Sequence, residues 1–136
     1  MTLALDTDVF IELINGKNPI VRRHYDRTLL AGRPIAISAI VMHELTFGAL
    51  ISQRQDHHMS LVRSFVTEHE VVDWTHADAL AAARIRANLE RRGLRIGSYD
   101  ALLAGQAINR DWTVVTGNRR EFGRVRDLDL EDWTKP

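Results

Sequence analysis

The stretch TLALDTDVFI, residues 2–11, joins a short apolar run to a pair of carboxylates. The apolar residues 3–5 are followed at once by Asp6, and Asp8 comes two positions later. This pattern is typical of a buried strand that ends in a polar site. In open parallel α/β sheets, ligands bind outside the carboxyl ends of the strands. We therefore expect Asp6 to lie at the functional edge of a sheet.

The rest of the chain alternates short apolar runs with helical patterns. Further strands are predicted at residues 34–37, 71–74 and 113–116, with a short edge strand at 128–130. Helices are predicted at residues 8–14, 20–31, 39–52, 57–69, 75–92 and 99–110. Strands that alternate with helices predict an α/β fold with a mostly parallel sheet that is covered on both faces.

Several helix ends carry their own signals. Gly16 and Gly93 are expected to stop the helices that precede them. Ser38 is expected to cap the helix that starts at residue 39. Thr75–Asp78 and Asn118–Glu121 both have the spacing of a capping box.

Length and composition narrow the class of protein. The chain has 136 residues and a formal net charge of zero, and we expect one domain over residues 1–136. It contains no cysteine, which excludes a thiolate nucleophile and fits a reducing compartment. No apolar run is long enough to span a bilayer, so we expect a cytoplasmic protein with no membrane partner. Sixteen of the 18 cationic residues are arginines, a bias that both phosphate binding and GC-rich coding explain.

Four polar residues follow strand ends or open helices, namely Asp6, Glu44, Asp100 and Asn118. Taken singly, each acid is explained as a helix-start or solvent-facing residue, and Asn118 as a cap. Taken together, the four residues are not well explained by these separate structural roles, because Glu44 and Asp100 lie in nearly apolar helices. Acids are almost never buried without a partner, and no lysine is well placed to supply one. A hard divalent cation such as Mg²⁺ would offset the repulsion between them.

Four segments resemble the PIN domain, and specifically the VapC toxins of bacterial toxin–antitoxin pairs. They are LDTDVFIELI at 5–14, SAIVMHEL at 38–45, IGSYDALLAGQAI at 96–108 and TVVTGNRREFGRV at 113–125. Their order and spacing cover essentially the whole chain. The resemblance implies a three-layer α/β/α domain with a mostly parallel central sheet.

The same resemblance implies an endoribonuclease that depends on Mg²⁺ or Mn²⁺. Asp6, Glu44 and Asp100 match the acidic metal site of the family. Where many members carry a further aspartate, this chain has Asn118, with Thr116 and Glu121 beside it. That difference puts a second metal ion in question. Arg119 and Arg120 follow Asn118, and they are candidates for holding RNA phosphates or are part of a solvated turn.

The resemblance also extends to partners and substrate. The C-terminal part is similar to the branch that cuts initiator tRNA in the anticodon loop. The family implies a homodimer and a small VapB-like antitoxin that covers the acidic cleft in a heteromeric complex. Operator DNA would be bound only through that antitoxin.

Two other readings stay open at this stage. Asp6 and Asp8 also resemble the paired acids of aspartyl-phosphate phosphatases and receiver domains, although Phe10 breaks the phosphatase pattern and Lys135 is the only late lysine. A non-catalytic module that binds a partner would need no divalent site at all.

Overall fold

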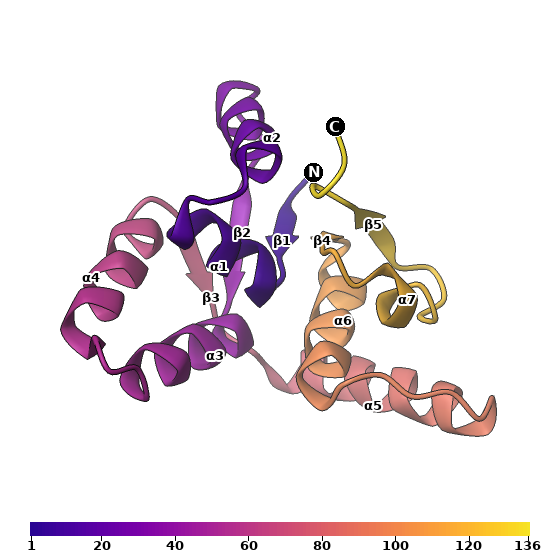
Figure 1. The fold of residues 1–136 in the computed structure, drawn as a ribbon. Helices are drawn as coiled ribbons and strands as arrows, with labels where there is room; N and C mark the ends of the chain where they lie inside the picture. The colour runs from indigo at the N-terminus through magenta and orange to yellow at the C-terminus, as the bar shows by residue number, and fades with distance from the viewer.

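The computed structural model describes residues 1–136 and contains a five-stranded sheet with seven helices (Figure 1). The strands are β1 (Leu3–Leu5), β2 (Ile35–Ser38), β3 (Glu70–Val72), β4 (Thr113–Val115) and β5 (Asp129–Glu131). The helices are α1 (Thr7–Asn15), α2 (Pro19–Leu30), α3 (Ala39–Leu50), α4 (Gln55–Val66), α5 (His76–Arg91), α6 (Ser98–Arg110) and α7 (Arg119–Phe122). No helix is both long enough and apolar enough to cross a membrane.

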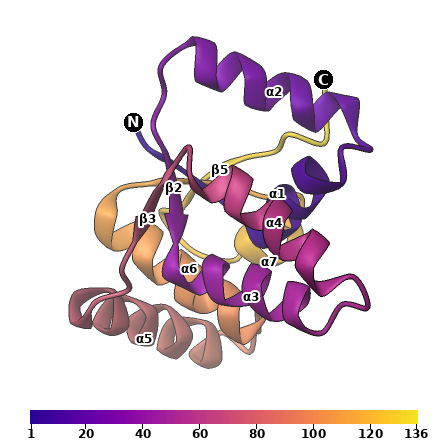
Figure 2. The same cartoon turned by 90° about the vertical axis from the view of Figure 1, so that its left-hand side faces the viewer.

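All four strand pairings are parallel, and the strand order is β3-β2-β1-β4-β5. This confirms the predicted parallel α/β fold and places β1 at the centre of the sheet. Two groups of helices flank the sheet. The first group is α1 to α4, in which α1 contacts the other three helices. The second group is α5 and α6, which pack mainly against each other (Figures 1 and 2). The result is the expected three-layer α/β/α arrangement.

The apolar run of β1 is the middle of the core. Leu3, Ala4 and Leu5 are all completely buried, as the run of apolar residues predicts for a strand covered on both faces. They belong to one hydrophobic cluster that also includes the largest buried side chains of the chain, such as Phe10 and Trp133. Asp6 therefore directly follows a completely buried strand of the core.

The predicted helix ends are mostly confirmed. Gly16 and Gly93 adopt the left-handed conformation, with φ of 65° and 67°. The Ser38 hydroxyl accepts a hydrogen bond from the backbone N–H of Ile40 at 3.1 Å. Both halves of the capping box between Thr75 and Asp78 are present.

Two element boundaries were predicted too late in the chain. The third strand was expected at residues 71–74, but it covers Glu70–Val72. Asp73 and Trp74 leave the sheet because β2, the one partner of β3, ends at Ser38 opposite Val72, and both residues contact α6 instead. The Asp73 carbonyl accepts from Gln106, and the Trp74 indole donates to the Leu102 carbonyl. The fourth helix ends at Val66 and not at residue 69.

Candidate active site

The candidate site is built around the carboxylate of Asp6, which is only 5% exposed. Asp6 follows β1 directly, and its backbone N–H continues the pairing with β4 by donating to the Val115 carbonyl at 2.9 Å. It is also the N-cap of α1. Because the strands on both sides of β1 are parallel to it, their carboxyl ends share the edge where Asp6 lies.

Both oxygens of Asp6 are hydrogen-bonded. Oδ1 accepts from the backbone N–H of Thr7 at 2.8 Å, and Oδ2 accepts from the Thr116 hydroxyl at 2.9 Å. Burial nevertheless raises the pKa of Asp6 to about 6, and the negative charges of Asp8 and Glu44 add to that effect. The two hydrogen bonds act in the opposite direction but are outweighed.

Glu44 comes to the site from the second turn of α3 and is half-buried. The Thr7 hydroxyl donates to its Oε1 at 2.8 Å. Thr7 therefore connects the start of α1 to α3 through one side chain, and it is itself buried. The sequence analysis did not single out Thr7. The available signal was its place between Asp6 and Asp8, since Asp6 already caps the helix and leaves the Thr7 hydroxyl free for another partner.

Asp100 lies in the first turn of α6 and is half-buried. Burial raises its pKa to about 7, and the charge of Asp6 is the next largest cause. Glu121, Glu44 and Asp8 raise it further. Neither Asp100 nor Asp6 forms an ion pair with a lysine or arginine. Asp8, in the first turn of α1, thus adds to the negative potential of the site.

The polar residues after β4 connect to these acids. The Asn118 side-chain amide donates to Glu121 Oε2 at 2.6 Å and to Asp100 Oδ2 at 3.4 Å. The Thr116 hydroxyl accepts from the Asn118 backbone N–H at 2.9 Å while it donates to Asp6. Thr116 and Asn118 therefore bridge the two aspartates.

The capping box predicted for Asn118 and Glu121 is only half formed. Asn118 Oδ1 accepts from the Glu121 backbone N–H at 3.5 Å, as expected. The return contact differs, because the Glu121 carboxylate binds the side-chain amide of Asn118 and the backbone N–H of Asn118 binds Thr116. The side chain of Asn118 is thereby held toward Asp100.

Arg119 and Arg120 are exposed on α7 and are not brought to the acids. The charge of Arg119 instead contributes to a lowered pKa at Asp132. Lys135 also lies near Asp132, and its carbonyl accepts a hydrogen bond from His24 at 2.7 Å. The lysine that an aspartyl-phosphate site requires is therefore absent from the surroundings of Asp6.

The donor set of the site suits a hard divalent cation. Carboxylate and amide oxygens are the ligands that Mg²⁺ prefers, and the pKa values of Asp6 and Asp100 are raised first by burial and then by the neighbouring acids. As they stand, no three His, Cys, Asp or Glu side chains are grouped closely enough to hold an ion. A cation here would face Asp6, Glu44 and Asp100 and would relieve their mutual repulsion.

Known proteins resemble this chain over nearly its whole length. Residues 3–128 match the PIN domain family. The chain is 37% identical over 134 residues to the tRNA(fMet)-specific endonuclease VapC of Shigella flexneri, covering 98% of this chain and 99% of that protein. It is 35% identical to Ribonuclease VapC2 of Rickettsia felis, over 99% of this chain and all of the relative. The crystal structure of VapBC2 from Rickettsia felis, bound to a DNA fragment from their promoter, superposes with a TM-score of 0.91 at 32% identity, over 98% of this chain and 99% of that one. This chain therefore belongs to the PIN domain family, and within that family to the VapC branch.

Proposed function

We propose that this protein is a divalent-metal-dependent endoribonuclease and the toxin of a type II toxin–antitoxin pair. The observation that carries the proposal is the meeting of Asp6 and Asp100, from separate elements, at one edge of the sheet with Glu44 beside them. Burial is the main cause of the raised pKa of each aspartate, and no cation of the chain offsets the charge of these two carboxylates. The names of the VapC relatives support an activity on RNA.

Asp6, Glu44 and Asp100 are the proposed ligands of Mg²⁺, with Mn²⁺ as a substitute. When bound, such an ion activates water and stabilises charge on a phosphodiester oxygen. The chain's own residues hold the acids in place. Thr7 orients Glu44, Thr116 orients Asp6, and Asn118, supported by Glu121, orients Asp100.

Initiator tRNA is the substrate that we propose. The support is the name of the Shigella flexneri relative, a tRNA(fMet)-specific endonuclease that matches nearly the whole chain. Such a substrate would place the action of the protein in the cytoplasm.

A VapB-like antitoxin is the partner that we propose. Support comes from structures of VapBC2 from Rickettsia felis and of VapBC from Salmonella typhimurium, both bound to DNA. In this proposal the toxin forms a homodimer, the antitoxin joins it in a heteromeric complex, and operator DNA is bound only through the antitoxin.

The test is cleavage of RNA by the purified protein without antitoxin. Total bacterial RNA is incubated with and without Mg²⁺, beside Asp6→Asn and Asp100→Asn variants, and the fragment ends are sequenced. We expect discrete fragments that require Mg²⁺, with cleavage by either variant reduced by a factor of about 100 or more. Ends in the anticodon loop of initiator tRNA would support the substrate.

Asp56→Asn is the matched control, because Asp56 is an exposed acid in the first turn of α4. It should cleave like the wild type. All three variants should keep the far-UV circular dichroism of the folded protein. Full activity in Asp6→Asn or Asp100→Asn would contradict the proposed roles, and fragments that form without a divalent ion would contradict the metal dependence.

A further inference from the structure

The arginines of this neutral chain are strongly concentrated in one segment. Residues 84–126 contain ten arginines and no lysine against four acids, a net charge of +6, so the rest of the chain carries −6. Only one of those ten, Arg110, forms an ion pair, and its partner Asp78 is completely buried. The other nine have no carboxylate within 4.0 Å. This segment includes the second half of α5 and all of α6 and α7, and hence carries Asp100 of the proposed active site.

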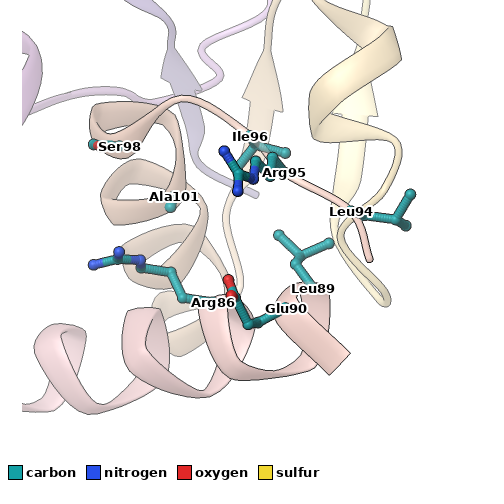
Figure 3. Close-up of a pocket in the computed structure, with 8 residues that line it drawn as sticks. All are labelled: Arg86, Leu89, Glu90, Leu94, Arg95, Ile96, Ser98 and Ala101. Atoms are coloured by element: carbon teal, nitrogen blue, oxygen red, sulfur yellow. The ribbon is translucent and has the colours of Figure 1, made fainter. Parts of the chain in front are cut away.

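A cavity of about 310 Å³ opens in this segment between α5 and the first turn of α6. Arg86 of α5, Arg95 of the connection between the helices, and Ser98 and Ala101 of α6 all line it. In Figure 3 the Arg86 side chain passes below Ala101, and the Arg95 side chain lies beside Ile96. Ser98 and Ala101 flank Asp100 in the sequence. Asp100 itself does not line the cavity, but it lies between these two residues in the first turn of α6, so the cavity and the proposed catalytic acid share that turn.

The two guanidinium groups are available for a ligand. Glu90 also lines the cavity, and it is the only carboxylate that does so, but it forms no ion pair with Arg86 or Arg95. The apolar part of the lining consists of Leu89, Leu94, Ile96 and Ala101. A volume of this size is roughly ten times the share of one water molecule in the liquid, which leaves room for a phosphate group.

The backbone around Arg95 is held in place by neighbouring arginines. The side chain of Arg124 donates to the Arg95 carbonyl, and the side chain of Arg92 donates to the Arg124 carbonyl at 2.8 Å. These bonds join the connection between α5 and α6 to the segment after α7. Arg95 is thus presented from a hydrogen-bonded backbone, so binding does not have to order the connection between the helices.

We propose that this cavity receives a backbone phosphate of the RNA, next to the phosphodiester that is cleaved, and that Arg86 and Arg95 bind it together. The proposal rests on the function proposed above, because it assumes that the bound chain passes Asp100. Planar guanidinium groups match phosphate oxygens in a bidentate geometry. Phosphate contacts position a nucleic acid without reading its sequence, so Arg86 and Arg95 would set the register of the strand over the acids.

The test measures RNA binding separately from cleavage. Affinity of the Asp100→Asn protein for fluorescent initiator tRNA is followed as a function of salt, with and without Arg86→Gln and Arg95→Gln together. We expect the double substitution to weaken binding about tenfold or more. The slope of log affinity against log salt should become shallower by about 1 to 2, since about one counterion is released for each phosphate contact. In the wild-type background, KM should rise while kcat stays nearly unchanged.

The matched control is Arg23→Gln with Arg27→Gln. Both arginines are exposed and unpaired on α2, which lies at the opposite end of the molecule from α5 (Figure 1). This pair changes the net charge equally but should leave affinity and salt slope unchanged. Arg86→Lys with Arg95→Lys should restore most of the slope, because the charges remain.

An equal loss of affinity in both glutamine pairs would overturn the proposal, because it would show a general effect of charge. An unchanged affinity in the Arg86 and Arg95 pair would overturn it as well. If the wild type cleaves RNA and the cavity pair behaves like the control, only this inference fails. If the wild type cleaves no RNA, the proposed function fails, and the binding data still decide whether the cavity holds phosphate.

Discussion

Thr7 shows how a single hydroxyl organises the acidic edge of the sheet. Its backbone N–H binds Asp6, and its side chain binds Glu44, so the two acids are held relative to each other through one residue. A hydrogen bond to a carboxylate contributes about 1.5–3 kcal/mol. Without it, Glu44 would be free to turn toward solvent, because it is only half-buried.

We predict that Thr7→Val lowers kcat for RNA cleavage about tenfold with little change in KM. Valine keeps the shape of threonine but removes the donor to Glu44. Thr7→Ser is the matched control, since it keeps the hydroxyl, and it should retain most of the activity. Steady-state cleavage of tRNA checks both variants. Equal activity of the valine and serine variants would show that the contact between Thr7 and Glu44 plays no part in the reaction.

At the scale of elements, the contact between α5 and α6 determines where Asp100 lies. Gly105 of α6 passes so close to α5 that an added Cβ would lie 2.5 Å from the Ala82 backbone. Asp78, at the start of α5, ties the two helices together, because it accepts hydrogen bonds from Asn109 and Arg110 of α6. Any separation of the two helices would shift the turn of α6 that carries Asp100.

We predict that Gly105→Ala destabilises the protein by about 1–3 kcal/mol, because the new methyl group forces α5 and α6 apart. The melting temperature should fall by about 5–10 °C, and RNA cleavage should fall with it, as Asp100 moves. Thermal unfolding followed by circular dichroism measures the first effect, and a cleavage assay well below the melting temperature measures the second.

Gly48→Ala is the matched control for that experiment. Gly48 is also inside a helix, α3, but an added Cβ there would meet nothing within 4 Å. Alanine favours the helix by about 1 kcal/mol over glycine, so this variant should melt at a slightly higher temperature. A Gly105→Ala protein as stable as Gly48→Ala would show that the helices separate without cost.

Elements that depend on local signals could be predicted from the sequence, and those that depend on distant contacts could not. Ser38 and Thr75 cap their helices because the cap is made within three residues. The end of β3 was misplaced because its partner β2, more than 30 positions earlier, stops at Ser38, and Asp73 and Trp74 bind α6 instead. Likewise, the spacing of Asn118 and Glu121 predicts a cap but cannot reveal that Asp100 lies beside them.

For the whole molecule, the sequence predicts that acids after strands meet at one edge, but it does not give the strand order. Asp6 lies between β2 and β4 only because β1 is the central strand. Asp100 reaches the same edge from a helix start and not from a strand end. The acids therefore come together through the topology of the sheet and the packing of α6, which neither alternation nor spacing encodes.

The carboxylates of the folded protein show two opposite kinds of pKa shift. Burial alone would raise the pKa of Asp78, but hydrogen bonds from Arg110, Thr75 and Asn109 lower it. Burial also opposes the shift at Glu131, where Arg33 and Trp133 lower the pKa. The stability that these groups contribute is present above the pKa of an unfolded carboxyl, near 4, and is lost as the pH falls.

Asp6 and Asp100 act in the opposite direction. Their folded pKa values, about 6 and about 7, lie above the ordinary value of 3.8, so the native state holds protons that the unfolded state releases. The stability that they contribute is complete below pH 4 and is lost as the pH rises through 6 to 7. Combining both groups, we predict that the metal-free protein is most stable near pH 5 and melts several degrees lower at pH 7.5.

A divalent metal ion should offset this loss of stability at pH 7.5. Such an ion binds only the native state and prefers ionised carboxylates, so it adds stability at the pH where both aspartates are charged. We predict that Mg²⁺ raises the melting temperature at pH 7.5 more than at pH 5, and that Asp100→Asn reduces both the pH-dependent loss and the effect of Mg²⁺. Differential scanning calorimetry at the two pH values checks this, with Asp56→Asn as the control. A wild-type protein that gains stability from pH 5 to pH 7.5 without metal would show that the two aspartates are not the buried, repelling pair on which the metal site depends.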